Sequence, residues 1–106
     1  MVLSILTRQT RITDRDVWEA SLGTVLPKIR ELLAAQPGFV SVQYLWGADD
    51  PGRIAQITTW HSESDCRKYI REGAAATVAT IEDAAVPTAG YPNGNWVRQN
   101  FAGADV

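Results

Sequence analysis

Residues 39–60, FVSVQYLWGADDPGRIAQITTW, decide the fold, because two strand patterns flank a run of turn residues in this stretch. Residues 39–47 and 53–60 alternate as half-buried strands do, and the segment between them is dense in Gly, Asp and Pro. The pattern predicts a hairpin with a loop longer than two residues. Alternation groups two sets of side chains on shared faces: Val40, Val42, Tyr44 and Trp46, and Ile54, Gln56, Thr58 and Trp60.

A helix is expected directly after this hairpin. Ser62 and Asp65 have the spacing of a capping box, which predicts a helix that begins near Glu63. Gly73 is expected to break this helix into two pieces. Its inner stripe would be Cys66, Tyr69, Ile70, Gly73, Thr77, Val78 and Ile81. A loop over residues 87–95 and a strand over residues 96–101 follow.

The chain before the hairpin has the same strand–helix order. Residues 2–11 are apolar on both faces, which indicates a strand in a sheet covered on both sides. Residues 14–35 predict one helix, with Thr13 as its N-cap and a kink at Pro27. Its apolar stripe consists of Trp18, Leu22, Val25, Leu26, Ile29, Leu32 and Leu33.

The element order is therefore β-α-β-β-α-β, which predicts an α+β, ferredoxin-like fold in a single domain of residues 1–106. The four-stranded antiparallel sheet would carry both helices on one face. The other face would be bare although it has apolar residues, so we expect two copies to pack sheet against sheet as a two-fold homodimer.

Composition excludes several function classes. The 106 residues are 45% hydrophobic, with ten Lys and Arg against twelve Asp and Glu, so there is no basic excess for nucleic-acid binding. No apolar segment is long enough to cross a membrane, and no signal peptide is visible, so we expect a cytoplasmic protein. One cysteine and one histidine, Cys66 and His61, can form neither an internal disulfide nor a usual zinc site.

Two short motifs resemble the antibiotic biosynthesis monooxygenase group. Residues 37–44, PGFVSVQY, resemble the PGF strand opening of that group, and residues 58–64, TTWHSES, look like its strand-to-helix junction. The resemblance extends over nearly the whole chain in element order. It implies a dimeric α+β barrel with a pocket between the sheet and the helices of each subunit.

Two branches of this group have recognisable active residues. The haem-degrading branch carries Asn, Trp and His where this chain has Thr7, Tyr69 and Ala79, so the resemblance implies no haem. The cofactor-independent branch, which forms quinones from anthrone-type polyketides with dioxygen, is similar at Tyr44 and Trp60. This chain differs from that branch at three positions: Gln56 stands in place of Asn, Cys66 in place of Tyr, and Thr80 in place of Arg.

The residues themselves can form an oxyanion site. Gln56 and Trp60 are four residues apart on one strand and face the same side, and both carry N–H donors. Tyr44 on the neighbouring strand could act as acid, base or donor, so these three residues are the predicted catalytic set. The alternatives are structural: Trp60 as a core anchor, Tyr44 packed in the core, and Gln56 paired with buried backbone.

Other polar residues are weaker candidates. His61 is the obvious base by its ordinary pKa, but it follows Trp60 directly and would face the other way. Cys66 fits a small core residue better than a nucleophile. Two arginines, Arg8 and Arg98, could hold an acidic substrate or could simply be exposed at the surface. Two residues of the last loop, Tyr91 and Asn95, could form a lid over a pocket.

The sequence thus predicts a cofactor-independent monooxygenase that acts with dioxygen on a small aromatic or quinone-like molecule and needs no metal. The first alternative is a non-catalytic small-ligand-binding or stress-associated dimer of the same fold. The second is an isomerase, a cyclase or a lactone-type degradative enzyme. Fold alone does not choose among these functions.

Overall fold

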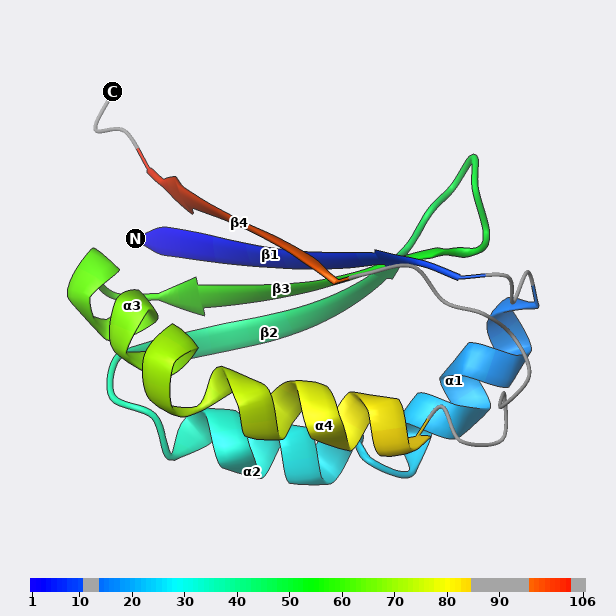
Figure 1. The fold of residues 1–106 in the computed structure, drawn as a ribbon, viewed down its shortest axis with the longest axis horizontal. Helices are drawn as coiled ribbons and strands as arrows, with labels where there is room; N and C mark the ends of the chain where they lie inside the picture. Colours follow the sequence, from blue (N-terminus) through cyan, green and yellow to red (C-terminus); the bar gives the residue numbers. More distant parts are fainter. Residues whose placement is uncertain (11–13, 85–95, 104–106) are drawn as a thin grey trace.

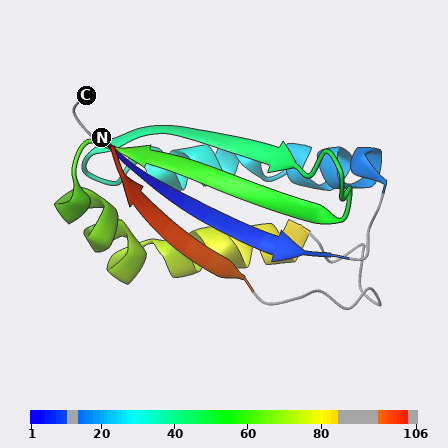
Figure 2. The ribbon, with the colours of Figure 1, turned by 90° about the horizontal axis from the view of Figure 1, so that it is seen from above.

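The computed structural model describes residues 1–10, 14–84 and 96–103. Four strands, β1 (Val2–Gln9), β2 (Phe39–Trp46), β3 (Arg53–Trp60) and β4 (Val97–Ala102), form one antiparallel sheet. The strand order is β2-β3-β1-β4 (Figure 2). This order confirms the ferredoxin-like α+β fold, because the two central strands come from the two different halves of the chain.

Four helices lie together on one face of this sheet: α1 (Arg15–Gly23), α2 (Leu26–Ala34), α3 (Glu63–Glu72) and α4 (Ala74–Ala84) (Figure 1). The predicted break at Gly73 is confirmed. The prediction of one kinked helix over residues 14–35 is wrong, since the chain forms two helices there. Pro27 lies in the first turn of α2, where its missing N–H removes no intrahelical hydrogen bond. A second helix therefore begins there, and the chain does not form one bent helix.

The junction between α2, β2 and α3 is fixed by Gly38 and by the cap of α3. The Ser62 side chain accepts a hydrogen bond from the Asp65 backbone N–H at 3.1 Å, which confirms the predicted cap. Gly38 has a φ of +79°, and a Cβ atom there would collide with the Asp65 side chain. The Gly38 carbonyl also accepts the His61 N–H at 2.9 Å. Only glycine combines this positive φ with the close approach of the Asp65 side chain without strain.

The strand alternation is confirmed on β3 and corrected on β2. Ile54, Gln56, Thr58 and Trp60 are all buried on the helix-covered inner face. On β2 the pairing shifts between Phe39 and Ser41, so Phe39 packs on the core while Val40 is 40% exposed. A bulge adds one residue to its strand and thereby reverses the faces before it.

The core lies between the inner face and the helices. Ile29 and Leu33 of α2, Cys66 and Tyr69 of α3, and Trp60 of β3 are its most buried members. The predicted helix stripes are therefore confirmed at these positions. Of the residues predicted to cap or line these helices, four fall outside what the structure describes: the cap Thr13 and the side chains of Trp18, Leu22 and Ile81.

The outer face of the sheet carries no helix, as Figure 2 shows from above. Leu45, Val97 and Phe101 are exposed there by 46%, 51% and 52%, respectively. Leu3 and Ile5 of β1 lie half-buried on the same face. Exposed apolar side chains gathered on one face favour a partner, and the homodimer stays a prediction. Among the described helices, none has the length and apolar character needed to cross a membrane.

Candidate functional site

The strand register places the polar residues of the inner face in defined rows. Tyr44 on β2 pairs with Gln56 on β3, and Gln56 pairs with Leu6 on β1. Leu6 in turn pairs with Arg98 on β4, so one row crosses the whole sheet. The next row toward the hairpin contains Trp46, Ile54 and Arg8. Directly opposed residues share a face, which brings Tyr44 and Gln56 into contact range.

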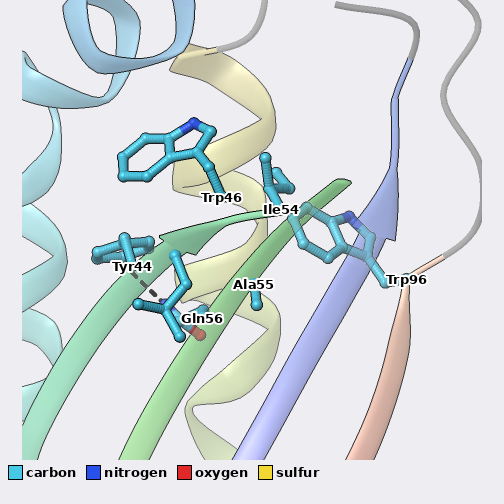
Figure 3. A pocket seen from close by; sticks show the side chains of 7 residues that line it. Tyr44, Trp46, Ile54, Ala55, Gln56 and Trp96 are labelled. Atoms are coloured by element: carbon cyan, nitrogen blue, oxygen red, sulfur yellow. Dashed lines mark hydrogen bonds between the residues drawn. The ribbon is translucent and has the colours of Figure 1, made fainter. Parts of the chain in front are cut away.

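Gln56 and Tyr44, which the sequence places on adjacent strands, form a hydrogen-bonded pair. The Nε2 of Gln56 donates to the Tyr44 hydroxyl at 2.8 Å (Figure 3). Gln56 is only 2% exposed, and its Oε1 is buried without a hydrogen-bond partner. A buried acceptor without a donor is costly, so this oxygen is an unusual feature of the inner face.

A hollow beside this pair has aromatic walls. It is lined by Tyr44, Leu45, Trp46, Ile54, Ala55, Gln56 and Trp96 and encloses about 280 Å³, including the part open to solvent (Figure 3). The walls stand close together, so the hollow is narrow.

Two arginines stack on the aromatic walls. The Arg15 guanidinium lies 4.9 Å from the centre of the Trp46 ring, and the Arg8 guanidinium lies 4.9 Å from that of Trp96. Cation–π contacts of this kind hold indole rings in place. Neither Trp46 nor Trp96 was predicted to lie in the site. The shared face of Trp46 and Tyr44 was the available signal for Trp46.

The environment keeps the Tyr44 hydroxyl protonated. Burial raises the pKa of Tyr44 to about 12, while the hydrogen bond from Gln56 acts in the opposite direction. Desolvation dominates because a phenolate in an apolar setting loses its hydration. Near neutral pH Tyr44 is therefore a hydrogen-bond donor rather than a base.

Trp60 lies apart from the hollow. Its side chain is fully buried, stacks on Tyr69 with ring centres 4.7 Å apart, and meets the Phe39 ring edge-on. Its indole N–H donates to Thr58 Oγ1 at 2.9 Å. The structure thus brings two of the three predicted site residues together and places Trp60 in the core, where its donor is already used.

The remaining candidates lie elsewhere. His61 is exposed beside the cap of α3 and does not line the hollow. Cys66 is 2% exposed, and burial raises the pKa of its thiol, with the nearby Arg98 acting in the opposite direction. Arg98 donates to Ser4 Oγ at 2.7 Å and lies over the Tyr69 ring. Tyr91 and Asn95 belong to a segment that the structure does not describe.

The described residues offer no evident metal site. Within residues 1–10, 14–84 and 96–103, no three His, Cys, Asp or Glu side chains lie close enough together to hold a metal ion. The hollow itself offers apolar and aromatic surface, and the hydrogen-bonded Gln56 and Tyr44 side chains belong to its wall.

Comparison with known proteins identifies the fold. No protein-family model and no curated protein matches the chain by sequence. Among solved structures, it matches SnoaB, a cofactor-independent oxygenase from Streptomyces nogalater, at 15% identity and a TM-score of 0.64, over 99% of this chain and 94% of that one. An antibiotic biosynthesis monooxygenase matches at 15% identity and a TM-score of 0.57, over 99% and 100% of the two chains.

A third structure is a mutant of MhuD with two manganese protoporphyrin IX molecules bound per active site. It matches at 18% identity and a TM-score of 0.64, over 100% of this chain and 98% of that one. The chain therefore has the fold of antibiotic biosynthesis monooxygenases. At these identities the likeness concerns the fold, and the chemistry has to be argued from the residues of this chain.

Proposed function

We propose that this protein is a cofactor-independent monooxygenase that acts with dioxygen on a small aromatic or quinone-like molecule. The observation that carries the proposal is the Gln56–Tyr44 pair, bonded at 2.8 Å beside an aromatic-walled hollow. Cofactor-free oxygenation needs a substrate that becomes an electron-rich carbanion or enolate, hydrogen bonds to its oxygen, and protection from water. The fold that the chain shares with SnoaB, a cofactor-independent oxygenase, supports the same class.

The reaction balances without an external reductant when the substrate has an activated methylene group, as anthrones have. The methylene carbon loses two hydrogens and gains one oxygen atom as a carbonyl, and the second oxygen atom leaves as water. The substrate supplies all four electrons. Tyr44 would donate to the substrate oxygen, and the Gln56 amide would hold Tyr44 in position while Trp46 and Trp96 contact the ring.

Trp60 has a supporting role in this proposal. Its stacking on Tyr69 joins β3 to α3 on the inner face, and its N–H bonds to Thr58 on its own strand. Trp60 therefore stabilises the packing of α3 against the sheet and does not contact the substrate. The buried side chain fits the structural alternative that the sequence left open for this residue.

We also propose that the protein is a cytoplasmic homodimer joined through the outer faces of the two sheets. The exposed Leu45, Val97 and Phe101 side chains support this arrangement, because a second copy would cover them. The strand register puts Leu45 and Val97 in one row of the outer face and Phe101 two rows away, so the apolar surface extends along the sheet.

The narrow hollow favours one alternative function, a non-catalytic binding protein. With Tyr44 protonated and His61 outside the hollow, no described side chain that lines it is an ordinary base at neutral pH. Dioxygen uptake separates the two functions. Purified protein without added cofactor is supplied with a panel of anthrones and hydroquinones. Uptake that saturates with substrate supports the oxygenase, and uptake no faster than the spontaneous rate supports the binding protein.

A further inference from the structure

Trp46 forms a wall of the hollow that no side-chain hydrogen bond holds in place. Tyr44, two residues earlier on the same face of β2, is fixed by the bond that it accepts from Gln56 at 2.8 Å. The Trp46 indole N–H, by contrast, is buried and has no hydrogen-bond partner. A buried donor without an acceptor is unfavourable, and contact with water would remove this cost. The observed position of the indole is therefore stabilised by contacts of its ring and not by its polar atom.

A cation–π contact holds the indole ring. The Arg15 guanidinium lies 4.9 Å from the centre of the Trp46 ring. Arg15 is the first residue of α1, and its Nε donates to the Glu19 carboxylate one turn later at 2.8 Å. The Arg15 and Glu19 side chains are 63% and 48% exposed, respectively. A cation–π contact at such an exposed site is weak, so thermal motion can break it while the rest of the fold stays intact.

The Trp46 side chain can turn without a change in the sheet. Trp46 is the last residue of β2, and its backbone pairs with that of Ile54 on β3. Figure 3 shows its indole and that of Trp96 on the two sides of Ile54. Ile54 is 7% exposed and belongs to the core cluster, so its movement would disturb the packing of the whole layer. The narrow hollow therefore widens most easily by rotation of the Trp46 side chain about its own bonds.

We propose that Trp46 is the gate of the hollow and that Arg15 is the positioning residue that keeps this gate closed. In the closed position, which the structure shows, the indole lies against the Arg15 guanidinium and its N–H is buried. In the open position the indole has turned away from Ile54, the N–H bonds to water, and the hollow is wider. Closure after a ligand has entered excludes water from it. The inference rests on the proposed function only because it takes the hollow as the place where the ligand binds.

Hydrogen exchange of the indole N–H groups tests the gate without any ligand. Each indole gives one N–H signal in the NMR spectrum of the ¹⁵N-labelled protein, and Trp46→Phe and Trp60→Phe identify the two signals needed. Trp60 is the internal control, because its N–H is fully buried, bonded to Thr58 at 2.9 Å, and exchanges only when the core opens. We expect the Trp46 N–H to exchange at least about tenfold faster than the Trp60 N–H, since turning one side chain costs less than opening the core.

Two matched variants then test the role of Arg15. Arg15→Gln removes the guanidinium and keeps a polar side chain that suits a helix. It should speed exchange of the Trp46 N–H by about two- to fivefold, as for one cation–π contact at an exposed site, and leave the Trp60 N–H unchanged. Arg67→Gln is the control, since Arg67 bonds Glu63 one turn away on α3 in the same manner but does not line the hollow. It should leave both exchange rates unchanged.

A Trp46 N–H that exchanges as slowly as the Trp60 N–H would overturn the inference. Exchange that Arg15→Gln leaves unchanged, or that it speeds equally for both indoles, would overturn it as well, and so would an equal effect of Arg67→Gln. The outcome is separable from that of the proposed function. Fast exchange of the Trp46 N–H in a protein without dioxygen uptake refutes the oxygenase only, whereas uptake by a protein whose two indoles are equally protected refutes the gate only.

Discussion

Gln56 donates a 2.8 Å hydrogen bond to the hydroxyl of Tyr44, its directly opposed neighbour on the adjacent strand. The pair thus depends on one register of the β2–β3 hairpin, because a slip of one residue would turn one side chain to the outer face. The same bond leaves the Tyr44 O–H free to donate, and the function proposed for the hollow depends on that donor.

The ionisation of Tyr44 makes the free energy of unfolding depend on pH in the alkaline range. Its pKa is about 12 in the folded protein and about 10 when exposed, so the unfolded chain loses this proton first as the pH rises. The contribution of protonated Tyr44 to the free energy of unfolding is complete below pH 10 and is lost between about pH 10 and 12. Urea unfolding at a series of pH values should show this decline, and Tyr44→Phe should reduce it. An equal decline in that variant would contradict the assignment.

Trp60 is expected to contribute to stability and not to ligand affinity. Trp60→Phe removes the bond to Thr58 and part of the core volume, so we expect a loss of about 1–3 kcal/mol in the free energy of unfolding. Trp96→Phe, in the wall of the hollow, should instead weaken ligand binding with a smaller loss of stability. Denaturant unfolding and calorimetry measure both quantities. The reverse pattern would place Trp60 in the site.

Gly38 is expected to be the glycine least tolerant of substitution. Gly38→Ala forces a side chain into a positive φ and against Asp65, so it should cost about 1–3 kcal/mol of stability. Gly23→Ala is the matched control, since nothing lies within 4 Å of the added methyl group. Thermal unfolding should show a clear drop for the first variant only. Equal melting temperatures would show that the α2–β2 junction adapts.

The proposed dimer can be tested at its apolar face. We expect light scattering to give twice the mass of one chain for the wild-type protein. Phe101→Glu puts a charge on the outer face, where Phe101 is 52% exposed, and should yield a folded monomer. Arg67→Glu, on the exposed side of α3, is the control and should stay dimeric. A wild-type monomer, or a dimer that survives Phe101→Glu, would contradict the outer-face interface.

The sequence predicted the arrangement of strands better than the exact faces and helix ends. Period-two alternation identified the inner face of β3 without error, because that strand is regular. On β2 the same rule misplaced Val40, since no local residue pattern announces the bulge beside it. Pro27 was correctly predicted to interrupt regular helix. It was treated as a residue inside one helix, where proline causes a kink, whereas it lies in the first turn of a second helix.

The site was predictable where it depends on neighbouring strands. Tyr44 and Gln56 follow from the hairpin register, whereas four residues of extended chain put Trp60 about 13 Å from Gln56 along the strand. Trp96 could not be foreseen, because it comes from the far end of the chain. It reaches the hollow only through the long-range pairing of β4 with β1. Its contact with Arg8 depends on that pairing too.

The most direct test of the account is oxygen incorporation by Gln56 variants. The wild-type protein, Gln56→Leu and Gln43→Leu are supplied with an anthrone under ¹⁸O₂, without cofactor and with a metal chelator present. We predict one labelled oxygen atom per product molecule and one dioxygen consumed, with at least a tenfold loss of rate in Gln56→Leu alone. Its stability should change by no more than about 1 kcal/mol, because only one hydrogen bond is lost. Unlabelled product, or equal rates in all three proteins, would contradict the central claim.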